Sequence, residues 1–430
     1  MEARTLTVDR AVDRDVVNNL RTYEVAVQRG DYDLYTGNLH GKHDNVRAYW
    51  EDQLTRLVLR PFLTTLMQRK RYALEQVRLL DLGCGTGQGY ELLTQIDQRD
   101  LDLGLFHQRV LSKQDVACYI GLDISAGMVA RGNALYADDP KMQFVQADLC
   151  KGLGDVAAEA PFDIYYSAYG SLSHLDTHDL KALLAEIAQH GQPGSLIVLD
   201  LLGRNSLEWP CYWEAHSEQE KYADYSMSYL LPDGTGNGEI EHFPIRYWTG
   251  REIEAAVAEV SATSGVHLDL RCKYDRSILV GRHIDTREYN PHLKPVRRFI
   301  NRLHQDYMRT DPQTLFFDPM LVPTHPDPAV QMFFTELVFS WNKLLTFFEQ
   351  RVQHKLTLVD IEGWESFSAP LQFALMTMDR VINSTEWMWY GDPRANVIEP
   401  QLGYALRSLE HSLQRGLGCG HGLLVVLEVK

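Results

Sequence analysis

Four glycines and an aspartate lie together in a stretch suited to holding a ligand through backbone groups. In 79–90 (LLDLGCGTGQGY) they are Asp81, Gly83, Gly85, Gly87 and Gly89. The residues at 77–83 predict a short buried strand and those at 88–96 a helix, a junction where backbone N–H groups meet a ligand. The third glycine of the dinucleotide-binding pattern would fall on Gln88 or Tyr90, and no Gly-Lys-Ser/Thr follows. The spacing therefore argues against NAD and nucleoside triphosphates.

The elements around this loop alternate between strand and helix. Strands are predicted at 77–83, 117–124, 142–148, 162–170 and 195–202, and helices at 88–96, 126–136 and about 176–190. This alternation predicts a parallel sheet with helices on both faces. The run 97–116 reads as an inserted helix or loop. Residues 265–284 predict an antiparallel strand pair at the sheet edge.

The motif D-L-G-C-G-T-G resembles motif I of the class I S-adenosylmethionine-dependent methyltransferases. Asp123 in GLDIS, Asp148 in VQADL and the run FDIYYSAYGSLSHL follow in the order of that family, and the resemblance covers about 77–284. It implies a Rossmann-like, mostly parallel seven-stranded sheet with helices on both faces. It also implies S-adenosyl-L-methionine as cofactor and a methyltransferase activity.

The resemblance also implies how the cofactor is held. Asp81 would bind the ammonium group of the cofactor, and the glycines would let the backbone approach its methionine and ribose parts. Asp123 would accept hydrogen bonds from the ribose hydroxyls, and Asp148 with Leu149 would bind the adenine edge. Asp115 competes for the ribose role but precedes its strand. The predicted cofactor-binding residues are Asp81, Gly83, Cys84, Gly85, Gly87, Asp123, Ile124, Met128, Asp148, Leu149 and Ser167. Alternatively, Asp148 caps a turn, and Met128 and Cys84 only pack in the core.

The methyl acceptor is expected above the end of the fourth strand. His174 is the candidate general base, since the usual pKa of histidine lies near neutrality, and Tyr169 is the second candidate catalytic residue. The alternative is that His174 packs in a helix cap and that Tyr169 only lines the cofactor pocket.

Three regions are expected: a helical cover at 1–76, the methyltransferase domain at 77–284, and a mainly helical extension at 285–430 that ends in a strand. A lid-like insertion is expected at 203–248. The candidate residues for roofing the site are Tyr35, His40, His43, Trp50, Trp209, Tyr212, Trp213, Glu214, His242 and Arg246. The aromatic run 332–352 predicts a helix buried in the core or, alternatively, in a homo-oligomer interface.

Composition narrows the function class. The net charge of −16 opposes binding to nucleic acid or an anionic membrane surface. The six cysteines are scattered without C-x-x-C, which favours reduced thiols and no metal site. The N-terminus is charged and no long apolar run is present, which favours a cytoplasmic protein. The sequence thus predicts methyl transfer to the oxygen, nitrogen or carbon of a small molecule. The alternatives are a peptide, protein or RNA acceptor, or a non-catalytic binding protein.

Overall fold

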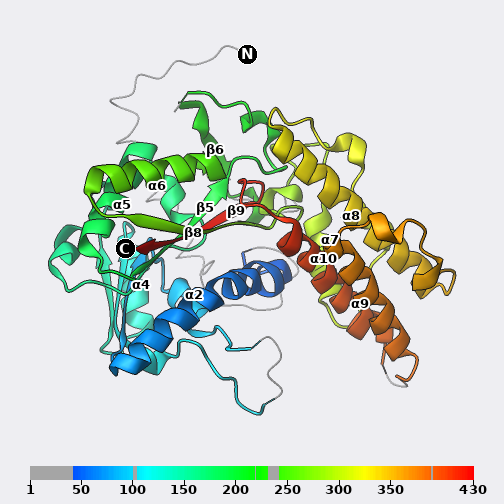
Figure 1. Cartoon of the computed structure of the whole chain (residues 1–430), viewed down its shortest axis with the longest axis horizontal. Coiled ribbons are helices and arrows are strands. Elements are labelled where there is room, and N and C mark those ends of the chain that lie inside the picture. The colour runs from blue at the N-terminus through cyan, green and yellow to red at the C-terminus, as the bar shows by residue number, and fades with distance from the viewer. Residues whose placement is uncertain (1–41, 100–103, 218, 231–241, 389–390) are drawn as a thin grey trace.

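The computed structural model describes residues 42–99, 104–217, 219–230, 242–388 and 391–430. Within these residues nine strands form one sheet (Figure 1). Their bounds are β1 Val77–Leu82, β2 Val116–Asp123, β3 Met142–Gln146, β4 Ile164–Tyr166, β5 Leu196–Gly203, β6 Tyr222–Ser226, β7 His242–Trp248, β8 Leu268–Arg276 and β9 Gly422–Val429.

The described α-helices lie around this sheet and in a separate stack. Their bounds are α2 Asp52–Ala73, α3 Gln88–Thr94, α4 Ala126–Leu135, α5 Thr177–His190, α6 Gly250–Ser264, α7 Val296–Leu303, α8 Pro328–Val352, α9 Ala369–Thr385 and α10 Glu399–Leu413. Among them, none combines the length and the apolar run that a membrane span requires.

The parallel core of the sheet has the order β3-β2-β1-β4-β5. The strand order reverses between β1 and β4, so a crevice opens there beyond the carboxyl ends of the strands. Alternate residues of each strand enter two cores. Leu80, Tyr165 and Ile197 pack on one face beneath α5 and α6, while Leu79 and Tyr166 face α2 on the other. The prediction of a mostly parallel sheet with helices on both faces is confirmed.

The last strand of the chain, β9, joins this sheet. β9 lies antiparallel between β5 and β8, with Leu196 opposite Glu428 and Leu202 opposite Gly422. The expectation of an antiparallel pair within 265–284 is wrong, because 268–276 is one strand whose partner comes from 422–429. The count of seven strands is exceeded by the hairpin β6–β7, which lies in the segment predicted as a lid and touches β5 only at Leu202 and Gly203.

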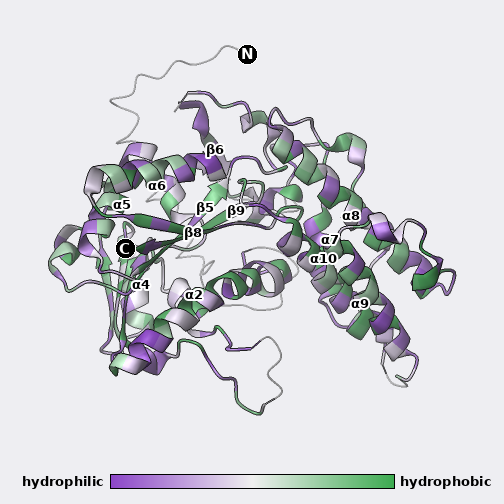
Figure 2. Cartoon of the chain, viewed as in Figure 1, coloured by the Kyte–Doolittle hydropathy of each residue, from purple (hydrophilic) through white to green (hydrophobic). Residues whose placement is uncertain are grey.

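Helices α7 to α10 form a stack beside the sheet, between β8 and β9 in the chain (Figure 1). Bands of hydrophobic and hydrophilic residues alternate along α2 and α8 (Figure 2), as in helices with one buried side. The aromatic residues of α8, among them Phe333, Phe334 and Trp341, are buried in the core of the chain itself. Trp50, just before α2, packs against Trp341 and donates a 2.9 Å hydrogen bond to Glu410 of α10. The N-terminal cover and the helical stack are thus joined.

Candidate active site

A cavity of about 270 Å³ opens at the carboxyl ends of the parallel strands. It extends from the loop after β1 past the ends of β2, β4 and β5 to the hairpin β6–β7 and the start of β9. The position agrees with the rule that open α/β sheets bind ligands where the strand order reverses. Nine of the predicted cofactor-binding residues line it, and Gly87 and Ser167 do not.

The glycine loop needs glycine for three different reasons. Gly85 has φ +55° and an added Cβ would meet nothing within 4 Å, so its backbone faces the open cavity. A Cβ on Gly83 would lie 2.5 Å from Ser171, and one on Gly87 3.0 Å from Phe144. Gly89, in α3, leaves room for Asp81, whose Oδ2 would lie 2.7 Å from a Cβ there. Close approach to a ligand therefore concerns Gly85 above all.

Asp123, at the end of β2, holds the loop in this shape. Its Oδ2 accepts a 2.8 Å hydrogen bond from the Gly85 amide, and its Oδ1 accepts one of 2.9 Å from the Ser125 amide. Each carboxylate oxygen keeps a second lone pair. Burial raises the pKa of Asp123. Asp115, the competing residue, instead forms a capping box with Ser112 at the start of β2.

Asp81 is a buried carboxylate whose surroundings lack a cation. Its Oδ2 accepts a 2.8 Å hydrogen bond from the Tyr119 hydroxyl, and in the part of the chain that the structure describes no basic side chain forms an ion pair with it. Burial, with the charge of Asp123 adding to it, raises the pKa of Asp81 to about 7. A buried carboxylate of this kind is complementary to a ligand that brings its own ammonium group.

The loop after β3 lines the far end of the cavity. Asp148 in this loop accepts a 3.1 Å hydrogen bond from the Cys150 amide and forms an ion pair with Lys151, so it caps a short turn. Asp148 also lines the cavity. Met128 and Cys84 are both buried and in contact with the cavity. Burial raises the pKa of the Cys84 thiol well above its usual value, which argues against a nucleophilic thiolate.

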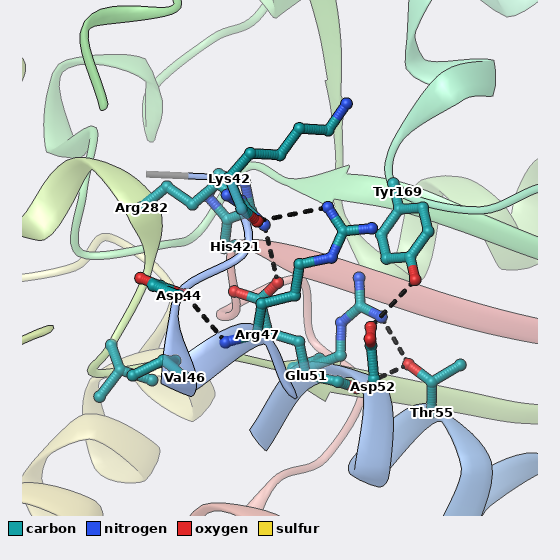
Figure 3. A network of polar contacts seen from close by, with 12 residues as sticks. Lys42, Asp44, Val46, Arg47, Glu51, Asp52, Thr55, Tyr169, Arg282 and His421 are labelled. Atoms are coloured by element: carbon teal, nitrogen blue, oxygen red, sulfur yellow. Dashed lines mark hydrogen bonds and ion pairs between the residues drawn. The ribbon is translucent and has the colours of Figure 1, made fainter. Parts of the chain in front are cut away.

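The segment before α2 places Arg47 next to the ring of Tyr169 (Figure 3). Its guanidinium donates a 3.0 Å hydrogen bond to Gln88 at the start of α3 and lies 4.0 Å from the centre of the Tyr169 ring. The Tyr169 hydroxyl in turn donates 3.0 Å to Asp52 of α2. The ring of Tyr169 is therefore clamped between the cover and β4, with its hydroxyl directed at α2.

The comparisons with known proteins agree with this geometry. Residues 104–194, from the segment before β2 to the end of α5, match the family model described as a methyltransferase domain. Over these residues the chain is similar to methyltransferases. No curated protein sequence matches the chain.

Several solved methyltransferase structures resemble part of the fold. A S-adenosylmethionine-dependent methyltransferase from Clostridium acetobutylicum ATCC 824 is 13% identical, with 60% of this chain and 90% of that chain covered and a TM-score of 0.34. CcbJ from Streptomyces caelestis is 16% identical, with 50% and 81% covered and a TM-score of 0.32. A DhpI-SAM-HEP complex is 14% identical, with 62% and 94% covered and a TM-score of 0.36. At these scores we infer nothing about the acceptor of this chain.

The hairpin β6–β7 lines one end of the cavity. Tyr225, Met227, Phe243 and Ile245 give it an apolar wall, and the His174 ring lies 5.1 Å from that of Phe243. Burial lowers the pKa of His174 to about 4, so its imidazole is neutral near pH 7. His174 and Tyr169 both line the cavity, as predicted, but His174 is a weaker base than histidine usually is.

Most of the residues expected to roof the site do not line the cavity. Trp209, Trp213 and Arg246 are buried elsewhere in the segment 203–248. The other residues expected there that lie outside the lining are His43, Trp50, Tyr212, Glu214 and His242. Tyr35 and His40, with the rest of 1–41, lie outside the described residues. The difference arises because the chain folds its lid as a hairpin, which the aromatic composition of the segment does not reveal.

Charged side chains also line the cavity and form what we call the ionic wall, which the sequence did not predict. Glu51 pairs with Arg282 at 3.1 Å and with Arg297 at 2.8 Å. Burial alone would raise the pKa of Glu51, but these two guanidinium groups hold it well below its usual value. Next to them, Asp200 of β5 pairs with Arg276 of β8 at 2.6 Å and accepts 2.8 Å from the Tyr169 amide. These residues come from four distant segments, so no spacing in the sequence announces them.

His421 and Glu208 complete this wall. The His421 Nδ1 lies 2.8 Å from Glu208 Oε2, and the other Glu208 oxygen accepts from the His283 amide. Although burial raises the pKa of Glu208, its contacts with the His421 imidazole and the His283 amide hold that pKa below its usual value. Within the described residues, no cluster of histidine, cysteine and carboxylate side chains has the geometry of a metal site.

Proposed function

We propose that this protein transfers the methyl group of S-adenosylmethionine to a small-molecule acceptor. The observation that carries the proposal is one cavity with two chemically different ends. The glycine loop, Asp81, Asp123 and Asp148 line one end, and the hairpin roofs the other. A cavity of this size covered by the chain itself suits a small acceptor better than a nucleic-acid strand or a folded protein.

The cofactor-binding roles follow from the side chains that are present. Asp81 would hold the ammonium, since it is a buried carboxylate without a basic partner in the described chain. Asp123 would accept hydrogen bonds from the ribose while keeping Gly85 in place. Asp148, Leu149, Ile124 and Met128 line the end that fits the adenine.

Arg47 is a candidate that the sequence did not indicate. Its guanidinium reaches Gln88 beside the glycine loop and in the described residues forms no ion pair. We assign it to the carboxylate of the methionine moiety, opposite the ammonium partner Asp81. The stacking on Tyr169 and the bond from Tyr169 to Asp52 fix its direction.

When bound, S-adenosylmethionine supplies an electrophilic methyl group for in-line displacement. The chain then needs to hold the acceptor in line and to exclude water. The ring of Tyr169, the His174 imidazole and the apolar hairpin wall line the space for this. Tyr169 and His174 remain proposed catalytic residues, and both come from the segment that follows β4.

Calorimetry tests the cofactor assignment. The full chain is expected to bind S-adenosylmethionine and S-adenosylhomocysteine, and Asp123→Ala is expected to abolish binding because it also frees the Gly85 amide. Asp115→Ala, which removes a carboxylate at the other end of the same strand, is the matched control and should bind normally. A wild-type chain that binds neither ligand would end the proposal.

A further inference from the structure

The cavity contains a second histidine, in a setting unlike that of His174. His421 is 8% exposed and lines the cavity, whereas its partner Glu208 is fully buried. The 2.8 Å contact from Nδ1 to Glu208 is the one hydrogen bond of the ring within the described residues. A carboxylate on Nδ1 fixes the proton there and leaves Nε2 as a hydrogen-bond acceptor.

The fold explains why this histidine reaches the site. β9 runs antiparallel, so its first residue, Gly422, lies opposite Leu202 at the carboxyl end of β5. Residue 421 therefore lies at the edge of the sheet where the parallel strands end and ligands bind. Glu208 comes from the loop just after β5, which brings the two partners together.

Arg282 provides the complementary group in the same cavity. Its Nη2 donates to Glu51, and in the described residues no other hydrogen bond from its side chain is present. A guanidinium has five N–H donors, so the others remain for a ligand. Arg282 and His421 both line the cavity, and Figure 3 draws both with Glu51, the ion-pair partner of Arg282.

We propose that His421, oriented by Glu208, is the general base that removes the proton from a hydroxyl group of the methyl acceptor. The O–H bond breaks, its electron pair stays on the oxygen, and the proton bonds to Nε2 of His421. That electron pair then forms the bond to the methyl carbon as the carbon–sulfur bond breaks onto sulfur. The imidazolium returns its proton to water. This inference rests on the proposed methyl transfer and deepens it.

The surroundings favour oxygen over nitrogen as the methylated atom. The oxygen becomes negative as its proton leaves, and the N–H groups of Arg282 stabilise that charge. An alkylamine is positively charged near neutral pH and would be repelled by the same guanidinium. The apolar wall of Tyr225, Met227 and Phe243 fits a flat apolar body. The acceptor class is therefore a small aromatic or unsaturated molecule with a hydroxyl group.

The first test needs no acceptor. Diethyl pyrocarbonate acylates neutral, reachable imidazole nitrogens, and peptide mass spectrometry of the treated native chain locates the modification. We expect His421 to be modified in the wild-type chain. In Glu208→Gln, with the fold unchanged, we expect the modification of His421 to be at least tenfold slower. His283, which is 1% exposed, is the internal control and should resist. An unmodified His421 in a chain that binds S-adenosylhomocysteine would overturn the proposal.

The second test measures transfer of labelled methyl from S-adenosylmethionine to matched aromatic compounds that bear a hydroxyl or an aminomethyl group. In His421→Asn we expect about 10²–10⁴-fold slower transfer to the hydroxyl compound, with unchanged affinity for S-adenosylhomocysteine. His411→Asn, outside the cavity, is the matched control. Glu208→Gln should lose rate with the same retained affinity. Transfer only to amines, or an unchanged rate in His421→Asn, would refute the assignment, while failure to bind the cofactor would instead refute the proposed function.

Discussion

Gly85 donates its backbone N–H to Asp123 over 2.8 Å, which ties the loop after β1 to the end of β2. The same carboxylate also accepts from the Ser125 amide at the start of α4. One side chain thus fixes the backbone that follows β1 and the backbone that follows β2. This arrangement leads to the first prediction.

Gly85→Ala should weaken binding of S-adenosylhomocysteine by at least about tenfold. The new Cβ would project into the cavity, and φ +55° strains a residue with a side chain. Gly154 has φ +57° and also has nothing within 4 Å of a Cβ, but it does not line the cavity. Gly154→Ala is therefore the matched control: it should cost similar stability and leave calorimetric affinity unchanged. Equal losses of affinity in both variants would contradict the role of Gly85.

Affinity for S-adenosylhomocysteine should rise as the pH rises toward about 7. Burial raises the pKa of Asp81 to about 7, so below that pH the side chain is mostly protonated and cannot pair with the ligand ammonium. The expected slope approaches tenfold per pH unit on the acid side. Calorimetry between about pH 5 and pH 7 measures it. Asp81→Asn should bind weakly with much less pH dependence, and a wild-type affinity independent of pH would argue against Asp81 as the ammonium partner.

Glu410 should make the folded chain less stable as the pH rises. Burial raises its pKa to about 7, although Trp50 and the Leu279 amide donate hydrogen bonds to it. Because the folded state holds this proton more tightly than the unfolded state, its contribution is complete below about pH 4.5 and is lost as the pH rises through about 7. The loss is on the order of 3 kcal/mol. Denaturant unfolding at several pH values should show this fall in wild type and a smaller one in Glu410→Gln.

Arg297→Ala should destabilise the chain by about 3–5 kcal/mol, because it leaves the buried Asp44 without its ion-pair partner and Glu51 with Arg282 alone. Arg297 pairs with Asp44 at 2.7 Å and Glu51 at 2.8 Å, and it is 3% exposed. The exposed pair of Arg309 with Asp392, also at 2.7 Å, is the matched control. Arg309→Ala should leave the denaturation midpoint nearly unchanged. Similar midpoints for the two variants would mean that the buried network contributes little.

Much of the cofactor end could be predicted because its residues lie next to strands that can be read locally. Asp81, Gly85 and Asp123 each end or follow a short apolar run, and the parallel sheet brings such ends together. The acceptor end could not be predicted in this way. Glu51, Glu208, Arg282 and His421 belong to four segments whose meeting depends on where β9 enters the sheet.

The errors in the fold have the same origin. Residues 265–284 contain two apolar runs, and nearest-neighbour reasoning pairs them with each other, but the partner of β8 follows the helical stack. The aromatic residues of 203–248 suggested a lid, and this segment contains the hairpin β6–β7, which lines the cavity. However, Trp209 and Trp213 use their indole N–H groups on backbone carbonyls of the same segment and stay below the surface. Composition predicts burial well and the direction of a side chain poorly.

The position of β9 between β5 and β8 has a consequence for biosynthesis. The ribosome makes β5 long before β9, since Leu196 pairs with Glu428. Until that pairing occurs, the nascent chain presents an open apolar edge along Leu196–Leu202, a surface prone to wrong association. Contacts so distant in sequence also form slowly. We therefore expect the nascent chain to need chaperones that cover this edge until β9 has been made. The ionic wall of the cavity is complete only after that point, because His421 immediately precedes β9.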